Sequence, residues 1–369
     1  MATTQIESPV DSIEEVEVAA YRIPTDFPES DGTLCWDATV LVVVRLQAGN
    51  HRGLGFGYAD KATATLIHDK LAPLVRGTDP LSIPATRCRL AEAIRNLGRP
   101  GIAAMAISIV DIALWDLKAR LLGLPLVDLL GAARDAVPVY GSGGFTSYSD
   151  DQLRDQLSGW VEMGIPRVKM KIGRDAVQDL DRVAVARRAI GDAQLFVDAN
   201  GAYSRKQALA QAHLFADAEV CWFEEPVSSD DLEGLHLLRD RAPAGMDIAA
   251  GEYGYDPFYF RRMLDAQAVD VLQADATRCG GVSGFLQVAA QCAARPLRLS
   301  GHTAPSIHAH LGCARPEVIH LEYFHDHARI ERMLFDGVLQ PVQGRLTPDR
   351  GRPGLGLDFK VADAERWKI

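Results

Sequence analysis

The hydrophobic and polar positions of the chain change their rhythm near residue 135. Before this point, two valine-rich runs bounded by turn residues predict strands at 15–21 and 38–46, and the run 53–58 could add a third that closes an antiparallel meander. Helical spacing then predicts three helices, at 61–75, 84–97 and 101–122. The segment 24–32 contains two prolines and a glycine among polar residues, which predicts a long loop. The first third of the chain is therefore expected to form an α+β domain.

After residue 135, short apolar runs alternate with amphipathic helical patterns. Eight such runs begin near positions 137, 167, 195, 220, 247, 269, 297 and 317. Helical spacing between them predicts seven helices, near 150–162, 177–190, 204–216, 230–240, 256–267, 282–294 and 304–314. Strands and helices that alternate at this period indicate a parallel sheet, and eight units indicate a closed barrel.

These patterns divide the chain into two expected domains. An α+β capping domain takes residues 1–133, and an α/β barrel takes residues 134–344. The tail from Gly337 onward is rich in glycine and proline, and we expect it to return along the first domain. Residues 345–369 would then complete the capping domain.

Composition and charge narrow the function classes. The 369 residues carry a net charge of −10, which argues against a nucleic-acid partner, because such proteins bind through a basic face. The start, 1–17, lacks the basic and apolar regions of a signal peptide. The most apolar stretch, 102–122, contains four charged residues, so we expect a buried helix and no membrane span. The six cysteines lack zinc-ligand spacing and indicate a reducing compartment, so a cytoplasmic protein is expected.

Charged or titratable residues recur once per strand–helix unit, at the ends of the apolar runs. They are Lys169 with Lys171, Asp198, Glu224, Glu252, Asp275, His302 and Glu322. In barrels of this kind the active site lies at the C-terminal ends of the strands. Charges placed there cost free energy unless they are paired or bound to metal, so the recurrence predicts one site built from many strands.

Three of these residues, Asp198, Glu224 and Glu252, end consecutive runs. Carboxylates that converge repel one another unless a cation lies between them. Hard oxygen ligands without a thiolate favour Mg²⁺, with Mn²⁺ as the alternative. Any one of the three could be an ordinary surface residue, but three in register indicate a metal site.

Lys169 and Lys171 lie two apart on one run, so their side chains share a face. Two close ammonium groups lower each other's pKa, and a nearby metal lowers both further. A lysine tuned in this way can act as a general base. Taken alone the pair could be a solvated basic edge, and its place one unit before the carboxylates favours the catalytic interpretation.

Asp275 and His302 end adjacent runs. An aspartate bonded to one ring nitrogen fixes the histidine tautomer and raises its basicity, which leaves the other nitrogen free to act as acid or base. Five further histidines cluster nearby and are interpreted as structural, namely His308, His310, His320, His325 and His327. Cys279 borders the site, so a reactive thiol there is an open alternative.

Glu322 closes the ring opposite the metal ligands. If protonated, it could donate a hydrogen bond to one oxygen of a substrate carboxylate. A metal on the other oxygen would then stabilise an enediolate, a strategy that combines a lysine or histidine base with Mg²⁺.

With these residues the sequence resembles the mandelate racemase subgroup of the enolase superfamily over nearly its whole length. The residues that match the subgroup's motifs are Lys169 and Lys171 in Lys-x-Lys, Asp198 in Val-Asp-Ala-Asn-Gly, Glu224 in Trp-Phe-Glu-Glu-Pro, Glu252 in Ala-Gly-Glu, the Asp275–His302 dyad and the electrophilic Glu322. Asn200 is similar to a residue that lies near the substrate in this family. The resemblance implies a modified TIM barrel, (β/α)7β, with an N-terminal α+β capping domain.

The resemblance also implies abstraction of the proton α to a carboxylate, with Mg²⁺ stabilising the enediolate. Our first interpretation is a hydro-lyase that dehydrates an acid sugar, an aldonate or aldarate, to a 2-keto-3-deoxy acid. The alternative is a racemase or epimerase of a 2-hydroxy acid, in which Lys171 and His302 act on opposite faces. A non-catalytic sugar-acid binding protein is a remote third. Cycloisomerase activity is disfavoured, because Asp275 and His302 occupy the side where the muconate-lactonizing subgroup places a lysine.

Substrate choice in this family lies with segments outside the ring of charges. The loop 24–37 and the segment 58–62 are expected to form a lid over the site. The small residues of 140–145 would leave room for a polyhydroxylated chain. The resemblance further implies a small carboxylate substrate and a homo-oligomer.

Overall fold

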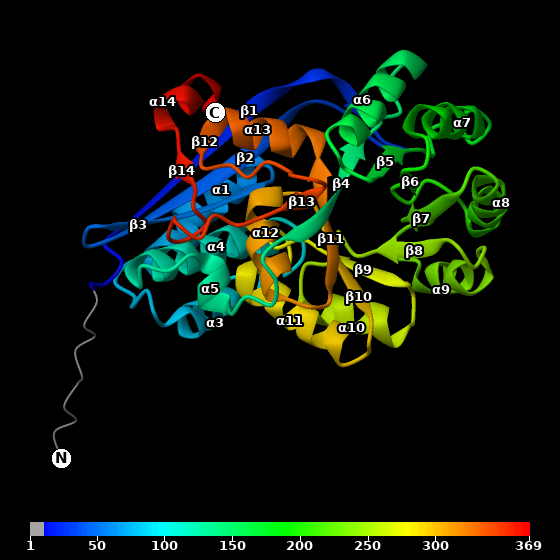
Figure 1. Ribbon diagram of the computed structural model, residues 1–369. Helices are drawn as coiled ribbons and strands as arrows, with labels where there is room; N and C mark the ends of the chain where they lie inside the picture. Colours follow the sequence, from blue (N-terminus) through cyan, green and yellow to red (C-terminus); the bar gives the residue numbers. More distant parts are fainter. Residues whose placement is uncertain (1–10) are drawn as a thin grey trace.

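Eight parallel strands form a closed barrel in the computed structural model, which describes residues 11–369 (Figure 1). The first ten residues, which belong to the expected capping domain and to the polar start, lie outside the described residues. The barrel strands are β4 (Val137–Gly143), β5 (Arg167–Lys171), β6 (Gln194–Asp198), β7 (Val220–Glu224), β8 (Asp247–Ala250), β9 (Val271–Ala274), β10 (Arg298–Gly301) and β11 (Val318–Phe324). Strand β11 returns to pair in parallel with β4, and the predicted modified TIM barrel is thereby confirmed.

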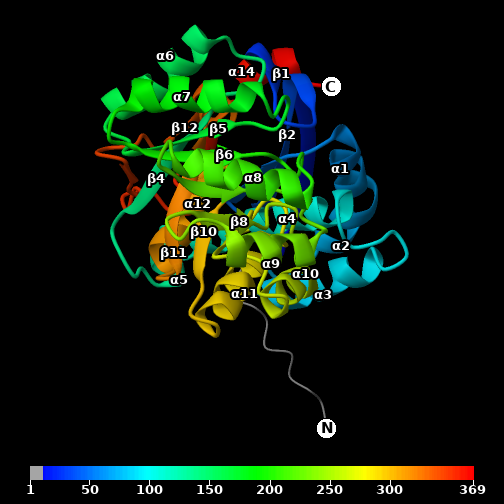
Figure 2. The ribbon, with the colours of Figure 1, turned by 90° about the vertical axis from the view of Figure 1, so that its right-hand side faces the viewer.

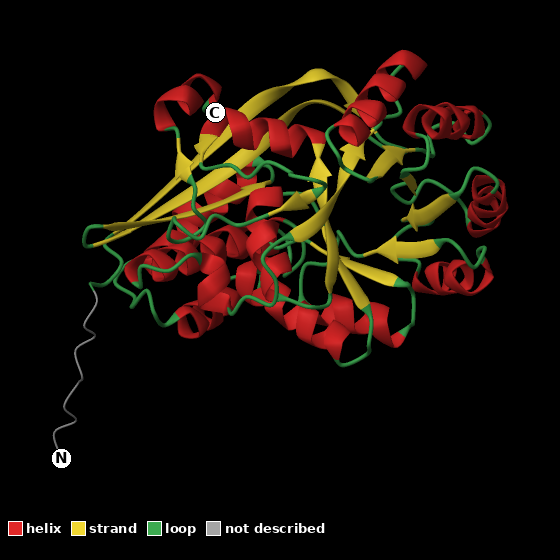
Figure 3. Cartoon of the chain, viewed as in Figure 1, coloured by secondary structure: helices red, strands yellow, loops and turns green. Residues whose placement is uncertain are grey.

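Helices lie around the barrel strands, as the red helices beside the yellow barrel strands at the right of Figure 3 show, and Figure 2 shows part of this outer layer face-on. The helices are α6 (Asp150–Glu162), α7 (Gln178–Ile190), α8 (Arg205–Ala216), α9 (Leu232–Arg241), α10 (Pro257–Asp265), α11 (Gly281–Ala293), α12 (Pro305–Ala314) and α13 (His325–Leu334). The first seven match the predicted helical patterns. Helix α13, which follows the last barrel strand, was not predicted.

Local sequence signals fix several helix starts. Ser149 and Gln152 form a reciprocal capping box at the start of α6, and Ser204 and Gln207 repeat it at the start of α8. Asp256 caps α10 with its carboxylate, directly before a proline at the first helical position. These signals explain why the sequence-based bounds of these helices lie within two residues of the observed ones.

The first part of the chain forms an antiparallel sheet packed on helices. The sheet contains β1 (Glu15–Ser30), β2 (Cys35–Ala48) and β3 (His51–Tyr58). The helical segments are α1 (Lys61–Leu66), a π-helical turn (Ile67–Leu71), α2 (Ala72–Val75), α3 (Ile83–Ala93), α4 (Ile102–Leu121) and α5 (Leu126–Leu130). All three predicted strands and all three predicted helices are present, and the short α5 was not predicted.

The prediction of a long loop over 24–32 is wrong. Strand β1 continues to Ser30 and pairs with β2 on both sides of an irregularity between Pro24 and Glu29. Because β1 is an edge strand, a proline in it need not break a hydrogen bond to a second neighbour. The hairpin therefore reaches the barrel as a sheet, where the backbone N–H of Thr146 donates to Ser30 O at 2.9 Å.

The tail returns along the first domain, as expected. It contains β12 (Phe335–Asp336), β13 (Arg345–Leu346), β14 (Asp358–Phe359), α14 (Val361–Ala364) and a 3₁₀ turn (Glu365–Trp367). The N–H of Leu355 donates to the Asp116 carboxylate of α4, and that of Ile369 donates to Ala20 O. Strand β13, however, pairs with barrel strand β4. We keep the domain bounds at 134 and 345 as a proposal.

Helix α4 lies between the capping sheet and barrel helix α11. The buried carboxylate of Asp111 accepts hydrogen bonds from the N–H and hydroxyl of Ser283, and the indole N–H of Trp115 donates to the same hydroxyl. The predicted buried helix is confirmed. Between residues 11 and 369, no helix combines the length and the apolar character that crossing a membrane requires.

Candidate active site

The C-terminal ends of the barrel strands bring the predicted charged residues together. Lys169 and Lys171 lie on β5, Asp198 and Glu224 end β6 and β7, Glu252, Asp275 and His302 follow β8, β9 and β10, and Glu322 lies on β11. All eight side chains are buried, with exposed fractions of 0–6%. Burying so many charges is tolerable only because they pair with one another.

Asp198, Glu224 and Glu252 converge as the sequence predicts. Each offers a carboxylate oxygen, and these oxygens lie within 4.8 Å of one another. Three buried hard oxygen donors without a thiolate fit Mg²⁺, which binds through carboxylates and keeps further positions for water or substrate. The residues present therefore suit the expected metal.

Both lysines contact this carboxylate cluster. Lys169 Nζ lies 2.5 Å from Glu224 Oε1 and 2.9 Å from Glu322 Oε1, and Lys171 Nζ lies 2.5 Å from Asp198 Oδ2. Burial by itself would lower the pKa of each lysine, but Glu224 and Asp198 outweigh it and raise both pKa values. The sequence reasoning counted the repulsion between the lysines and the effect of a bound metal, and it did not count these contacts with carboxylates. The lowered pKa therefore stays a prediction for the metal-bound site.

An aromatic floor closes the barrel beneath the carboxylates. The rings of Tyr140, Phe196, Trp222 and His320 pack together inside the barrel, with Phe196 and Trp222 stacked at 5.1 Å. The indole N–H of Trp222 and the amide of Gln273 each donate to Glu224 Oε2 at 3.0 Å. The sequence reasoning missed both donors. Trp222 lies two residues before Glu224, and residues two apart on a strand share a face, so the period of the strand could have indicated it.

Asp275 and His302 form the predicted dyad. Nδ1 of His302 donates to Asp275 Oδ2 at 2.8 Å, and its Nε2 lies 3.1 Å from Glu252 Oε2. Burial lowers the pKa of His302, but Glu252, Glu322 and Asp275 outweigh it and raise the pKa to about 10. Thr277 donates to Asp275 Oδ1 through its N–H and its hydroxyl, both at 2.7 Å, and so holds the aspartate in place.

Neighbouring cations favour the ionised form of Glu322 in this arrangement, whereas the sequence reasoning considered a protonated donor. Burial raises its pKa, but Lys169 and His302 outweigh this effect and lower the pKa to about 2. Its oxygens accept hydrogen bonds from the Ser142 hydroxyl at 2.5 Å and the Thr303 N–H at 3.2 Å. Glu322 therefore accepts hydrogen bonds and holds neighbouring donors in place in this arrangement.

A pocket of about 400 Å³ opens above these residues, between the two domains. Lys171, Asn200, Glu252, His302 and Glu322 line it directly. Lys169, Asp198, Glu224 and Asp275 lie outside the lining, in the buried layer around it. The predicted lid segments contribute residues 31, 34 and 36 from the hairpin and 58–60 from the end of β3 and the following turn. The amine of Lys171, the imidazole of His302 and the carboxylate of Glu252, a member of the candidate metal triad, therefore lie at one cavity.

Family models match both parts of the chain. The N-terminal domain of mandelate racemase/muconate lactonizing enzyme matches residues 15–131, and the enolase C-terminal domain-like model matches residues 152–364. The chain belongs to the mandelate racemase/muconate lactonizing enzyme family. The resemblance found in the sequence is thereby confirmed.

Relatives of this family member carry names that fit its site. L-Talarate/galactarate dehydratase of Salmonella typhimurium is 33% identical over 97% of this chain and 91% of its own length. A mandelate racemase/muconate lactonizing enzyme-like protein from Rubrobacter xylanophilus superimposes with a TM-score of 0.95 at 54% identity, covering 97% and 100% of the two chains. A mutant L-talarate/galactarate dehydratase with bound Mg and L-glucarate superimposes with a TM-score of 0.90 at 30% identity, covering 100% and 95%.

Arg278 and His327 are among the pocket residues of this mandelate racemase family member that escaped the sequence reasoning. Arg278 donates to Glu252 O at 3.1 Å, and its Nε lies 3.6 Å from Asp275 Oδ2. His327, interpreted as structural, lines the pocket and stacks on the ring of Tyr58. Arg278 lies three residues after Asp275, in the turn before α11, so its place beside a strand-end carboxylate could have indicated it. His327 belongs to the unpredicted helix α13, so no strand-end rule could find it.

A further expectation about the site is wrong. The glycines of β4 leave no room for substrate, because a β-carbon on Gly141 or Gly143 would overlap Trp160 or Gln156 of α6 outside the barrel. Only the alternate residues Tyr140 and Ser142 face inward. Cys279 is buried, and burial raises the pKa of its thiol well above the ordinary value, which disfavours the open alternative of a reactive thiol.

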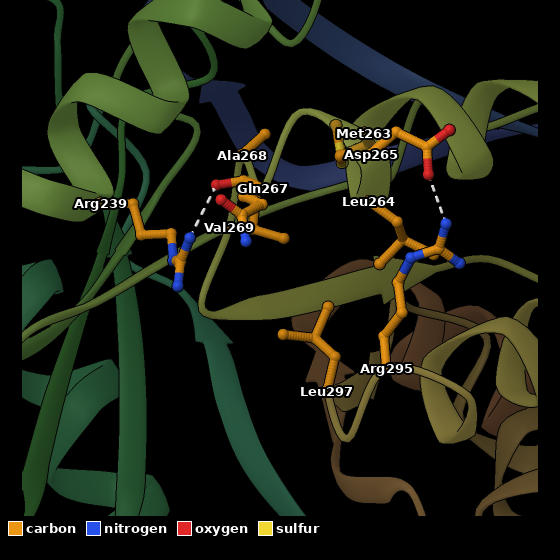
Figure 4. A pocket seen from close by; sticks show the side chains of 9 residues that line it. All are labelled: Arg239, Met263, Leu264, Asp265, Gln267, Ala268, Val269, Arg295 and Leu297. Atoms are coloured by element: carbon orange, nitrogen blue, oxygen red, sulfur yellow. Dashed lines mark hydrogen bonds and ion pairs between the residues drawn. The ribbon is translucent and has the colours of Figure 1, made fainter.

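A second hollow, of about 420 Å³, lies at the opposite end of the barrel (Figure 4). Val269 and Leu297, which line it, precede β9 and β10, whereas Asp275 and His302 follow the same strands. Its two arginines are already engaged, since Arg239 donates to Gln267 O at 3.1 Å and Arg295 pairs with Asp265. We assign the chemistry to the first pocket.

Proposed function

We propose that the protein is a Mg²⁺-dependent hydro-lyase that removes the proton α to the carboxylate of an acid sugar and dehydrates it to a 2-keto-3-deoxy acid. The observation that carries the proposal is the placement of Lys171 and His302 at one pocket beside a convergent carboxylate triad. A base and an acid on separate strands can act on two neighbouring carbons of one substrate.

Asp198, Glu224 and Glu252 would hold the metal. Bound there, Mg²⁺ would take over carboxylate oxygens that keep the lysines protonated and would offset the negative charge that develops on the substrate carboxylate. Lys171, the lysine that lines the pocket, then takes the α-proton. Lys169, fully buried between Glu224 and Glu322, holds these carboxylates in place.

His302 supplies the acid for loss of the β-hydroxyl. Asp275 accepts a hydrogen bond from Nδ1 and holds the ring, so that Nε2 faces the pocket side, from which the proton is delivered. Proton transfer to the departing hydroxyl releases water. Asn200 lines the pocket with a buried carbonyl oxygen that has no partner among the described residues, which suits a hydroxyl of the substrate.

The test is a library of aldonic and aldaric acids incubated with protein and Mg²⁺ and assayed for 2-keto-3-deoxy products. Product from at least one acid, lost on addition of a chelator, is the expected result. Exchange of solvent deuterium at the α-carbon without loss of water would indicate the racemase alternative. Absence of both product and exchange across the library contradicts the proposal.

The expectations from the sequence about oligomeric state, location and partners belong to this proposal as well. We propose that the protein forms a homo-oligomer and acts in the cytoplasm on a small carboxylate, without a nucleic-acid or membrane partner. Light scattering after size-exclusion chromatography measures the oligomeric state, and a molar mass of one chain would contradict that part.

A further inference from the structure

The pocket has two walls of different chemistry. The barrel wall carries the metal-binding and proton-transferring groups. The capping wall, defined as the lining residues between positions 31 and 60, contains no lysine, arginine or histidine among the described residues. Its charged members are Asp31 and Asp60, both acidic. A substrate that spans the pocket therefore meets cations at one end and carboxylates at the other.

The cations of the barrel wall are already paired. Lys171 contacts Asp198 at 2.5 Å, and Arg278 lies 3.5 Å from Glu252 and 3.6 Å from Asp275. His302 bonds Asp275 at 2.8 Å and lies 3.1 Å from Glu252. No lysine or arginine of the lining is thus left without an acidic partner in the described residues. A second carboxylate on the substrate would find no unpaired cation.

The rest of the capping wall offers an apolar surface to the pocket. The indole N–H of Trp36 donates to buried Glu29 at 2.7 Å, and the Tyr58 hydroxyl donates to His327 O at 3.2 Å. The Thr39 hydroxyl is likewise engaged, by Asp326. Because these polar atoms are used inside the protein, the wall offers ring and aliphatic surface, which suits the C–H faces of a sugar chain.

The two acids suit hydroxyl groups. Oδ1 of Asp31 accepts from Thr33 and Leu34, whereas its Oδ2 makes no hydrogen bond within the described residues. Asp60 caps α1 through Oδ1, which accepts from Ala62 N–H at 2.8 Å. Each carboxylate therefore keeps an oxygen that can accept from a hydroxyl and that repels another carboxylate.

We propose that the substrate is a monocarboxylic sugar acid whose far end is a neutral, hydroxyl-bearing carbon, so that aldonates are substrates and aldarates are poor ones. This inference rests on the proposed function, because it takes the substrate carboxylate to lie at the metal. Discrimination arises from Asp31 and Asp60, which repel a second carboxylate that no cation offsets.

The first experiment compares matched pairs of acids. Gluconate with glucarate, and galactonate with galactarate, differ only at the far end and are assayed with Mg²⁺ for kcat/KM. The aldonate of the accepted configuration is expected to exceed its aldarate by at least about tenfold, which corresponds to about 1.4 kcal/mol. Equal or faster turnover of the aldarate overturns the inference and leaves the proposed dehydration standing.

Failure of the proposed function has a different signature. If no acid is turned over, calorimetric titration of the same pairs into the Mg²⁺-loaded protein decides the inference on its own. Tighter binding of the aldonate keeps it, and equal or tighter binding of the aldarate, or no binding of either, overturns it.

Charge variants test which wall is responsible. Leu34→Arg adds a cation at an exposed position of the capping wall and is expected to raise the aldarate-to-aldonate ratio of kcat/KM about tenfold. Leu97→Arg adds the same charge at an exposed position outside the pocket lining and should leave the ratio unchanged. Asp60→Asn keeps a residue that can cap α1, removes one negative charge and should shift the ratio in the same direction as Leu34→Arg. An unchanged ratio in both pocket variants overturns the inference.

Discussion

The two ends of the barrel carry hollows of nearly equal volume, but their charged side chains differ in burial. At the C-terminal end, eight charged or titratable side chains are almost fully buried and paired among themselves. At the N-terminal end, the pair Arg295–Asp265 is exposed by 38% and 55%. The difference teaches that cavity size does not locate chemistry in this fold. A dense cluster of buried charges around a pocket does, whereas single buried carboxylates such as Asp111 and Asp116 tie helix α4 to neighbouring segments.

The largest effect is expected when the proposed base, Lys171, or the proposed acid, His302, is removed from the C-terminal end. Lys171→Ala and His302→Asn should each lower kcat by about 10²–10⁴-fold, the usual contribution of general acid–base catalysis. His302→Asn should lose dehydration while α-proton exchange that depends on Lys171 persists. Dehydration is followed by product formation, and exchange by deuterium uptake in the recovered substrate. Unchanged dehydration and exchange in His302→Asn would show that this histidine has no part in the reaction.

Metal binding should distinguish the two ends through stability. Mg²⁺ at 100 times its dissociation constant stabilises a protein that binds it only when folded by about 2.7 kcal/mol. A rise in melting temperature with Mg²⁺ is therefore expected for the natural chain and should be absent in Asp198→Asn. The control Asp265→Asn, at the other hollow, should keep the full rise. If only Asp265→Asn lost the rise in melting temperature, the metal would bind at the N-terminal hollow and not at the carboxylate triad.

The packing of β4 against α6 gives a third contrast. Gly141→Ala places a methyl group into the ring of Trp160 and should destabilise the fold by about 1–3 kcal/mol, as overpacking does. Gly159→Ala on α6 itself meets no atom within 4 Å and should be stabilising by about 0.5–1 kcal/mol. Denaturant unfolding measures both. Equal stability of the two variants would show that the β4 glycine does not make room for the helix.

The smallest effect is expected at the N-terminal hollow. Arg295→Ala removes an ion pair between two partly exposed side chains and should change the free energy of unfolding by about 0–1 kcal/mol. Its kcat/KM for the accepted acid should equal that of the natural chain. A clear loss of activity in this variant would mean that the hollow of Figure 4 communicates with the reaction.

The sequence predicted the barrel and the members of its site for one physical reason. Parallel strands buried on both faces read as continuous apolar runs, so a charge such as Asp198 or Glu224 at the end of a run stands out. The ends of all strands then meet at one edge, which places these residues together without any knowledge of distances. Trp222 and Gln273, which hold Glu224 from below, carry no such contrast and were not found.

The pKa shifts of the site residues could not be predicted. They depend on which side chains of neighbouring strands touch, and the sequence does not give these distances. The pKa values of Lys171 and Glu322 follow from carboxylate and ammonium neighbours on other strands. The extension of β1 past Pro24 depends in a similar way on its being an edge strand. Helix α13 begins with charged residues and follows directly on β11, so no turn signal separated it from the barrel strand.

Asp116 links the start of the chain to its end and so sets an order of assembly during synthesis. One of its carboxylate oxygens accepts from the N–H of Leu54, and the other accepts from the N–H of Leu355. Because synthesis runs from the N-terminus, β3 and α4 leave the ribosome long before Leu355. The second oxygen of Asp116 therefore gains its Leu355 partner only after the barrel segment has been made. The capping domain therefore reaches its final hydrogen-bonding only after the barrel has been synthesised between its two parts.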